Sequence, residues 1–124
     1  MSLSQQVDGL IEMVERGEFI EAFPRFYAVD AEMQENDNPP RVGIDALIAN
    51  ERMMLAAFPQ VQARALSRFV SGDQAVIRWT FEFVAPHGAT IRLDELTLQT
   101  WRDGRIVHEK FYYDPVQMRP VSAG

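Results

Sequence analysis

Alternating apolar and polar residues fill the stretch QAVIRWTFEFVAPHGATIRLDELTLQTW, residues 74–101, and this pattern decides the fold. A period of two is typical of a strand with one buried face. The turn-forming residues PHG at 86–88 divide the stretch into two strands. Similar alternating runs at 60–70 and 105–114 are joined to it through the turn signals SGD and RDG. The second half of the chain therefore predicts a four-stranded antiparallel meander.

The first half of the chain has the helical period instead. Three helical patterns follow one another, at residues 4–16, 18–28 and 43–58. Between the second and the third, Asp30 to Glu35 reads as a short strand that runs into a turn. Three helices before a meander predict an α+β fold, with the helices packed on one face of a curved, mostly antiparallel sheet. With no internal repeat or linker, we expect residues 1–124 to form a single domain.

Composition and charge narrow the function classes. The formal net charge is −6 and the pI about 4.8, which disfavours a protein that tracks nucleic-acid phosphates. The chain has no cysteine and two separated histidines, His87 and His108, so we expect no thiolate nucleophile and no metal site. No apolar run approaches the roughly 20 residues of a membrane span, and MSLSQQVDG does not resemble a signal peptide. We expect a cytoplasmic protein.

The inner faces of the predicted strands carry polar groups among aromatic ones. Strict alternation gives the concave side, under the helices, the aromatic residues Trp79, Phe81 and Phe111 and the polar residues Glu95, Thr97, Gln99 and Glu109. A buried carboxylate without partners is costly, so such groups are kept when they are paired, wet or functional. Aromatic walls with a few convergent polar groups are typical of a small-ligand pocket. The alternative is the rim of an ordinary core, with Glu95 or Glu109 paired to an arginine.

The same alternation describes the opposite face of the sheet. It places Val107 on the concave side and Ile106 on the opposite side. The opposite face mixes charged and apolar residues: Arg64, Arg68, Arg78, Glu82, Arg92 and Asp94 with Leu66, Leu96 and Leu98. This face is too apolar for open water and too charged for a core, so it predicts a homodimer formed through the sheet.

Two acids outside the meander are further candidates. Glu35 lies where the chain leaves the short strand, and the nearby acids Glu32 and Asp37 could raise its pKa, which would suit a base near neutral pH. The alternative is a solvated turn acid. Glu51 falls on the apolar stripe of the third helix, three residues after Ile48. Because buried acids are rare, the alternative is that Glu51 reaches water from the edge of the stripe.

The order of these elements resembles the nuclear transport factor 2-like superfamily over nearly the whole chain. The segments RFYAVDAEMQEN (25–36), WRDGRIVHEKF (101–111) and YYDP (112–115), with the helix-opening Gly43, are most similar to its SnoaL-like, polyketide cyclase-like branch. The resemblance implies a cone-shaped α+β fold. It does not choose a function, because this superfamily includes isomerases, cyclases, dehydratases, hydrolases and non-catalytic binders.

Ketosteroid isomerase, in the same superfamily, offers a test by residue. Its catalytic carboxylate follows the early short strand, at a place similar to Glu35. Its two oxyanion donors correspond to Leu10, which cannot donate, and Thr97, a weaker donor than a desolvated carboxylic acid. Since losing such a donor costs on the order of 3 kcal/mol, ketosteroid isomerase activity is not expected. The aspartate of polyketide cyclases is matched by Asp114, although Asp-Pro is also an ordinary strand stop.

The leading hypothesis is an enzyme that binds a small hydrophobic carbonyl compound and transfers a proton next to the carbonyl, without metal or organic cofactor. Glu35 is the expected base, with Glu95 or Glu109 as a second acid. The expected ligand-binding residues are Tyr27, Glu51, Trp79, Phe81, Thr97, Gln99, Phe111 and Tyr113. The alternatives are a module that binds a small ligand without chemistry and a dimeric scaffold with a vestigial pocket.

Overall fold

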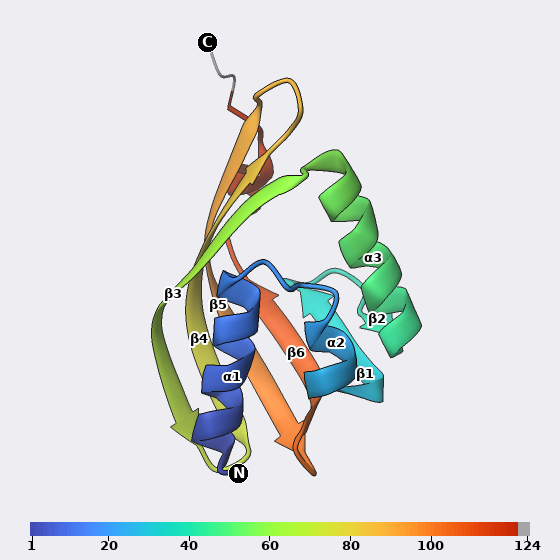
Figure 1. Ribbon diagram of the computed structural model, residues 1–124, viewed down its shortest axis with the longest axis vertical. Coiled ribbons are helices and arrows are strands. Elements are labelled where there is room, and N and C mark those ends of the chain that lie inside the picture. The colour runs from blue at the N-terminus through green and yellow to red at the C-terminus, as the bar shows by residue number, and fades with distance from the viewer. Residues whose placement is uncertain (122–124) are drawn as a thin grey trace.

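One curved six-stranded sheet organises the molecule (Figure 1). The computed structural model describes residues 1–121. The strands are β1 Tyr27–Glu35, β2 Arg41–Val42, β3 Gln60–Ser71, β4 Gln74–Val84, β5 Thr90–Arg102 and β6 Arg105–Tyr112. Their order across the sheet is β2-β1-β6-β5-β4-β3. Neighbouring strands are antiparallel, except that β1 runs parallel to β6.

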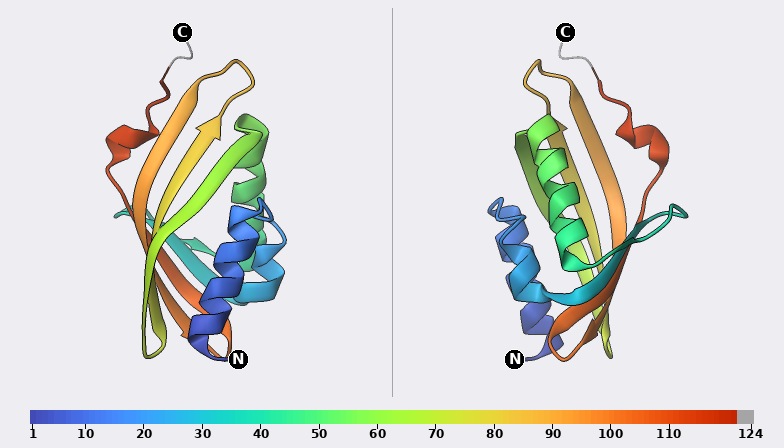
Figure 2. Two further views of the ribbon diagram at one scale, coloured as in Figure 1. Left: turned by 60° about the vertical axis from the view of Figure 1, so that its left-hand side comes forward. Right: turned by 90° about the vertical axis from the view of Figure 1, so that its right-hand side faces the viewer.

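Three helices lie on the concave side of this sheet (Figure 2). They are α1 Leu3–Glu15, α2 Ala22–Phe26 and α3 Ile44–Ala57, and a short 3-10 helix, η1 Pro115–Met118, follows β6. A capping box begins α1: the Ser2 hydroxyl accepts from the Gln5 amide, and the Gln5 side chain accepts from the Ser2 amide. Pro24 is tolerated in α2 because it lies in the first turn, where backbone N–H groups have no helical partner.

The predicted fold class is confirmed, and several local expectations are wrong. The second helix does not extend over 18–28; it ends at Phe26, and Tyr27 already has the extended backbone of β1 (φ −108°, ψ 142°). The early strand thus begins at Tyr27 rather than Asp30. The meander is also not the whole sheet, because β1 adds to it in parallel beside β6 and the two-residue β2 pairs with β1.

A bulge in β6 changes which residues face the core. Thr100 pairs with His108 and Trp101 with Ile106, so Val107 is left out of the pairing. Ile106 therefore lies on the concave side and is fully buried, which corrects the expectation from strict alternation.

A second bulge, in β3, leaves out Leu66. Ala65 pairs with Trp79 and Ser67 with Arg78, so the residue after Ser67 returns to the concave side. That residue, Arg68, was predicted on the outer face. Its guanidinium instead contacts α1, through Asp8 at 2.6 Å and Ser4 at 2.8 Å.

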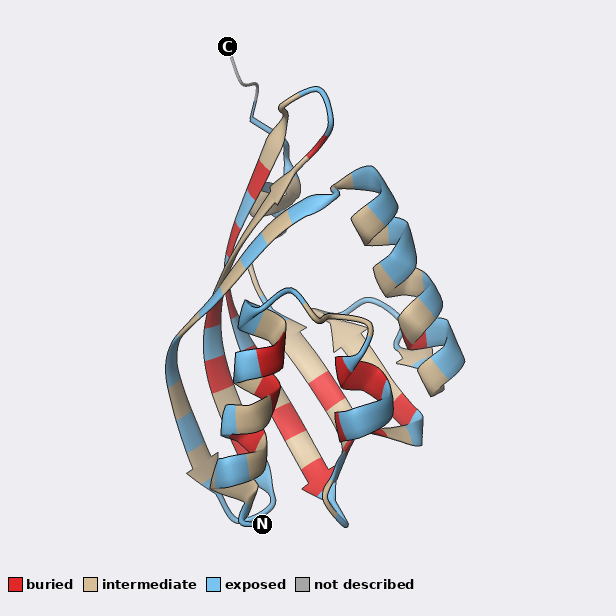
Figure 3. Ribbon diagram, in the orientation of Figure 1, coloured by how far each residue is buried: buried red, intermediate tan, exposed pale blue. Residues whose placement is uncertain are grey.

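The core fills the space between the helices and the lower part of the sheet (Figure 3). Val7 and Leu10 of α1 are buried against Ile77 and Trp79 of β4 and other core residues. The Phe26 and Trp101 rings meet edge to face, with centroids 6.3 Å apart. Among residues 1–121, no helix is long and apolar enough to cross a membrane.

The β6 bulge predicts unequal effects of two adjacent truncations. Ile106→Ala is expected to lower the free energy of unfolding by about 2–5 kcal/mol, because it leaves a cavity in the core. Val107→Ala, in a half-buried side chain outside the ladder, is expected to lower it by roughly 1 kcal/mol or less. Urea unfolding measures both, and equal losses would contradict the bulged register.

Candidate functional site

A cavity of about 150 Å³ lies between the concave face of the sheet and the helices. Its walls are mostly apolar, and the aromatic ones come from the loop between α1 and α2, from α2 and from the strands, with Trp79, Phe81, Phe83 and Phe111 among them. Seven polar residues also line it: Tyr27, Glu35, Asn50, Glu51, Glu95, Gln99 and Glu109. An apolar cavity with a few polar groups is the general form of a small-molecule site.

A chain of hydrogen bonds crosses the floor of this cavity from β5 to β1. The indole Nε1 of Trp101 donates to Oε1 of Gln99 at 3.0 Å. Gln99 Nε2 donates to Oε2 of Glu109 at 2.7 Å, and the Tyr27 hydroxyl donates to Oε1 of Glu109 at 2.5 Å. Because an indole can only donate, Trp101 fixes the orientation of the Gln99 amide and so aims its NH₂ group at Glu109.

The Glu109 carboxyl is strongly affected by its position. It is 2% exposed, and this burial raises its pKa to about 7, opposed by the hydrogen bonds from Tyr27 and Gln99, which favour the charged form. Each of its oxygens already accepts one of these bonds. Burial, first, and then the neighbouring Glu109 raise the pKa of Tyr27 well above 10.0, so Tyr27 stays protonated as the donor.

Glu95 lies on the same face of β5 but has a different environment. Its side chain is 6% exposed, and no hydrogen bond or ion pair to it is formed by the described part of the chain. Burial, followed by the charges of Glu109 and Glu35, raises its pKa to about 8. At neutral pH the Glu95 carboxyl is therefore mostly protonated and can donate a hydrogen bond into the cavity.

Glu35 stands at the rim. It is the last residue of β1, it lines the cavity, and its side chain is 34% exposed. Arg41 of β2 lies 3.7 Å from its carboxylate. Facing it from α3, Glu51 is half-buried, and its pKa is raised by burial and then by Glu35. Glu51 thus lines the cavity, as its position on the apolar stripe suggested.

The structure brings most of the sequence-predicted residues together. Those that line the cavity are Glu35, Glu95, Glu109, Tyr27, Glu51, Trp79, Phe81, Gln99 and Phe111. Thr97 does not: it is fully buried, its strand neighbours Ile77 and Phe111 flank it, and its hydroxyl has no partner among residues 1–121. Tyr113 also lies outside the lining, although the charges of Glu35 and Glu95 add to the burial that raises its pKa.

Sequence reasoning missed several lining residues. Asn50 and Met54 of α3 lie one turn apart on the cavity side, next to Glu51, and the helical period could have found them. No sequence pattern indicated Met118, because its place in the cavity wall depends on how η1 packs against the sheet. The Gln117 side chain bonds both backbone groups of Asp94, which holds η1 beside β5. Asp114 is exposed and caps η1 through the Val116 amide, so it does not line the cavity.

The arrangement combines two carboxyl groups in different environments. Glu35, at the rim beside Arg41, can accept a proton, and Glu95, in the apolar interior, can donate a hydrogen bond. A proton acceptor and a hydrogen-bond donor that line one cavity are what acid–base chemistry requires. Within residues 1–121, no three acidic or histidine side chains are arranged to hold a metal ion.

The chain is similar to known proteins in sequence pattern and in fold. The family model described as a SnoaL-like domain matches residues 7–109. A candidate SnoaL-like polyketide cyclase from Jannaschia sp. CCS1 superposes with a TM-score of 0.81 at 19% identity, over 100% of this chain and 97% of that one. No curated protein sequence matches significantly.

Two further solved structures share the fold, and only one of the two is named as an enzyme. A nuclear transport factor 2-like protein of unknown function from Burkholderia pseudomallei K96243 gives a TM-score of 0.82 at 21% identity, with 95% of each chain covered. An LEH-like epoxide hydrolase from M. tuberculosis gives a TM-score of 0.76 at 13% identity, over 92% of this chain and 84% of that one. Identities this low show a shared fold, not a shared reaction.

The raised pKa of Glu95 predicts how stability depends on pH. Between about pH 4.5 and pH 8 the folded protein holds a proton that the unfolded chain has lost, so the free energy of unfolding falls as pH rises through this window. The slope from one such group is at most about 1.4 kcal/mol per pH unit. Glu95→Gln is expected to flatten the slope, while Glu21→Gln, at an exposed site, leaves it unchanged. Urea unfolding at several pH values measures this, and an unchanged slope in Glu95→Gln would contradict the raised pKa.

Proposed function

Since the chain belongs to the SnoaL-like domain family, whose fold encloses a cavity here, we propose that it binds a small hydrophobic carbonyl compound and transfers a proton next to the carbonyl. The observation that supports this most is that the rim residue Glu35 and the buried, unpaired Glu95, whose pKa is raised to about 8, line the same cavity. The reaction class is that of a cofactor-independent isomerase, cyclase or dehydratase.

The proposed step assigns one role to each of these acids. Glu35 takes a proton from the carbon next to the carbonyl, and the electron pair of that C–H bond moves into the enolate. Glu95 donates a hydrogen bond to the carbonyl oxygen, where negative charge develops, as an oxyanion donor does. The proton then returns to the same carbon or to a conjugated one. Nothing is oxidised or reduced, and no co-reactant is needed.

Glu109 fits this scheme as a fixed partner rather than as the second acid. Each of its oxygens already accepts a bond, one from Tyr27 and the other from Gln99, so neither is left free for a ligand. Its charge instead raises the pKa of Glu95. Between the two candidates for the second acid, the proposal therefore selects Glu95.

A second candidate function is a binding module without chemistry. The same cavity would hold an apolar molecule, and Glu95 and Glu35 would only orient it. This alternative is favoured by the partial exposure of Glu35 and its contact with Arg41, because a carboxylate held at the rim by an ion pair can orient a ligand without reacting with it. The two candidates differ in whether Glu35 is needed for turnover.

Hydrogen–deuterium exchange at the carbon next to a carbonyl tests the proposal without knowledge of the natural substrate. In D₂O, the protein is expected to accelerate exchange in at least one of cyclohexanone, β-tetralone and progesterone. Glu35→Gln should remove the acceleration, and Glu95→Gln should lower it by about 10²–10³-fold, the usual cost of one oxyanion donor. Proton NMR follows the exchange.

The control is Glu21→Gln, an exposed acid outside the cavity, which should exchange as the wild type does. Acceleration that survives in Glu35→Gln would show that another group is the base. No acceleration of any of the three ketones, with binding detected, would favour the binding module.

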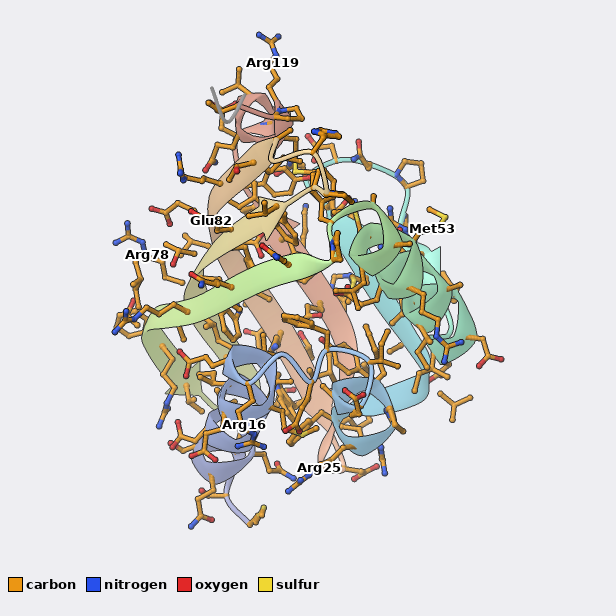
Figure 4. All side chains as sticks on the ribbon, turned by 45° about the horizontal axis from the view of Figure 1, so that its top comes forward. Arg16, Arg25, Met53, Arg78, Glu82 and Arg119 are labelled. Atoms are coloured by element: carbon orange, nitrogen blue, oxygen red, sulfur yellow. The ribbon has the colours of Figure 1, made fainter. Side chains whose placement is uncertain are left out.

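We also propose that the outer face of the sheet forms a homodimer. Arg78 and Glu82 project from this face (Figure 4), paired with Asp94 at 2.7 Å and Arg92 at 2.9 Å. The paired strands place Leu96 between Arg78 and Tyr112, and both Leu96 (48% exposed) and Tyr112 (44% exposed) face outward. Apolar groups among neutralised charges suit an interface between two copies.

Leu96→Asp is expected to convert the dimer to a monomer, because it puts an unpaired charge at the centre of the buried patch. Light scattering after size-exclusion chromatography measures the mass, with Met53→Asp, on the exposed side of α3, as the matched control. A wild type that is monomeric at micromolar concentration would contradict the dimer.

A further inference from the structure

The size of the cavity limits the ligand. Sites for drug-sized molecules usually enclose about 300–1,000 Å³, whereas this one encloses about 150 Å³. An apolar cavity of about 150 Å³ in another protein holds one benzene molecule. A molecule with two or more fused rings therefore does not fit wholly inside unless the walls move.

The charges of the lining limit the ligand in a second way. Four carboxyl groups face the cavity, from Glu35, Glu51, Glu95 and Glu109, and no lysine, arginine or histidine of the described residues lines it. Arg41 is close, but it lies beside Glu35 at the rim. A ligand carboxylate or phosphate would meet like charge in a region of low dielectric, without a cation to balance it.

The hydrogen bonds already made in the cavity limit the ligand in a third way. Tyr27, Gln99 and Glu109 satisfy one another, with Trp101 behind them. Glu95 is only 6% exposed, and no described residue forms a hydrogen bond with its carboxyl group. Its carboxyl proton is therefore free to be donated to a ligand. A buried donor without a partner favours a ligand that brings a single acceptor, such as a carbonyl oxygen, to this point.

From these three limits we propose that the site takes an uncharged carbonyl compound no larger than one six-membered ring, with its oxygen on Glu95 and its ring against Trp79 and Phe81. This inference rests on the proposed function and narrows its substrate class. It excludes steroids, fused-ring polyketides and carboxylic acids as ligands of this cavity. The apolar ring replaces water along the aromatic walls, and the acceptor satisfies the remaining donor.

The test compares ligands of equal size and different charge. Binding to the wild type at pH 7 is measured by NMR titration with cyclohexanone and cyclohexanecarboxylate. Cyclohexanone is expected to bind at least about tenfold more tightly than the carboxylate. Equal or tighter binding of the carboxylate would overturn the inference, and so would no binding of cyclohexanone.

The size limit is tested with β-tetralone and with an enlarged cavity. The wild type should bind β-tetralone at least about tenfold more weakly than cyclohexanone, and Phe81→Ala should reverse this order by removing a wall. Phe69→Ala, on the exposed outer side of β3, removes the same ring elsewhere and should leave both affinities unchanged. Met54→Ala provides a second enlargement if Phe81→Ala fails to fold.

These outcomes separate the inference from the proposed function. Tight binding of β-tetralone or progesterone to the wild type, with exchange that depends on Glu35, would overturn the size limit and leave the proton-transfer function standing. Selective binding of cyclohexanone without exchange would support the ligand class and reject the chemistry.

Discussion

The buried carboxyl of Glu109 is the constraint on which the site depends. An acid at 2% exposure is stable only if its oxygens are hydrogen-bonded, and its donors come from two other strands: Gln99 from β5 and Tyr27 from β1. The antiparallel pairing of Gln99 with Glu109 supplies the first. The parallel pairing of β1 with β6 supplies the second and brings Glu35 opposite Phe111. The topology of the sheet thus assembles the cavity floor and its rim together.

Electrostatics then makes the four carboxyl groups unequal. Arg41 and water reach Glu35. Glu95 is 6% exposed and has no cation beside it in the described part of the chain. Burial, followed by the charges of Glu109 and Glu35, raises the pKa of Glu95 to about 8, so its carboxyl is mostly protonated at neutral pH.

The sequence predicted the fold class and many of the residues that line the cavity, for a clear physical reason. Period-two alternation assigns side chains to faces, so Glu95, Gln99 and Glu109 could be placed together before the structure was known. Bulges break that logic without a local signal, which is why Ile106 and Arg68 were put on the wrong face. The parallel partner of β1, and Met118 in the cavity wall, depend on long-range docking that no local pattern encodes. Thr97 satisfied the alternation and lies between Glu95 and Gln99 on the same face of β5, but its short side chain is fully buried between Ile77 and Phe111 and does not line the cavity.

The protonation state of Glu95 is the central claim, and the most direct measurement is its pKa from carbon-13 NMR of the glutamate carboxyl groups, with Glu95→Gln to assign the signal. The account predicts a titration near pH 8, with the Glu95 carboxyl still protonated at neutral pH. A titration near the ordinary value of 4.5 would contradict it, because Glu95 would then be a second anion in the cavity and could not donate a hydrogen bond to a carbonyl oxygen.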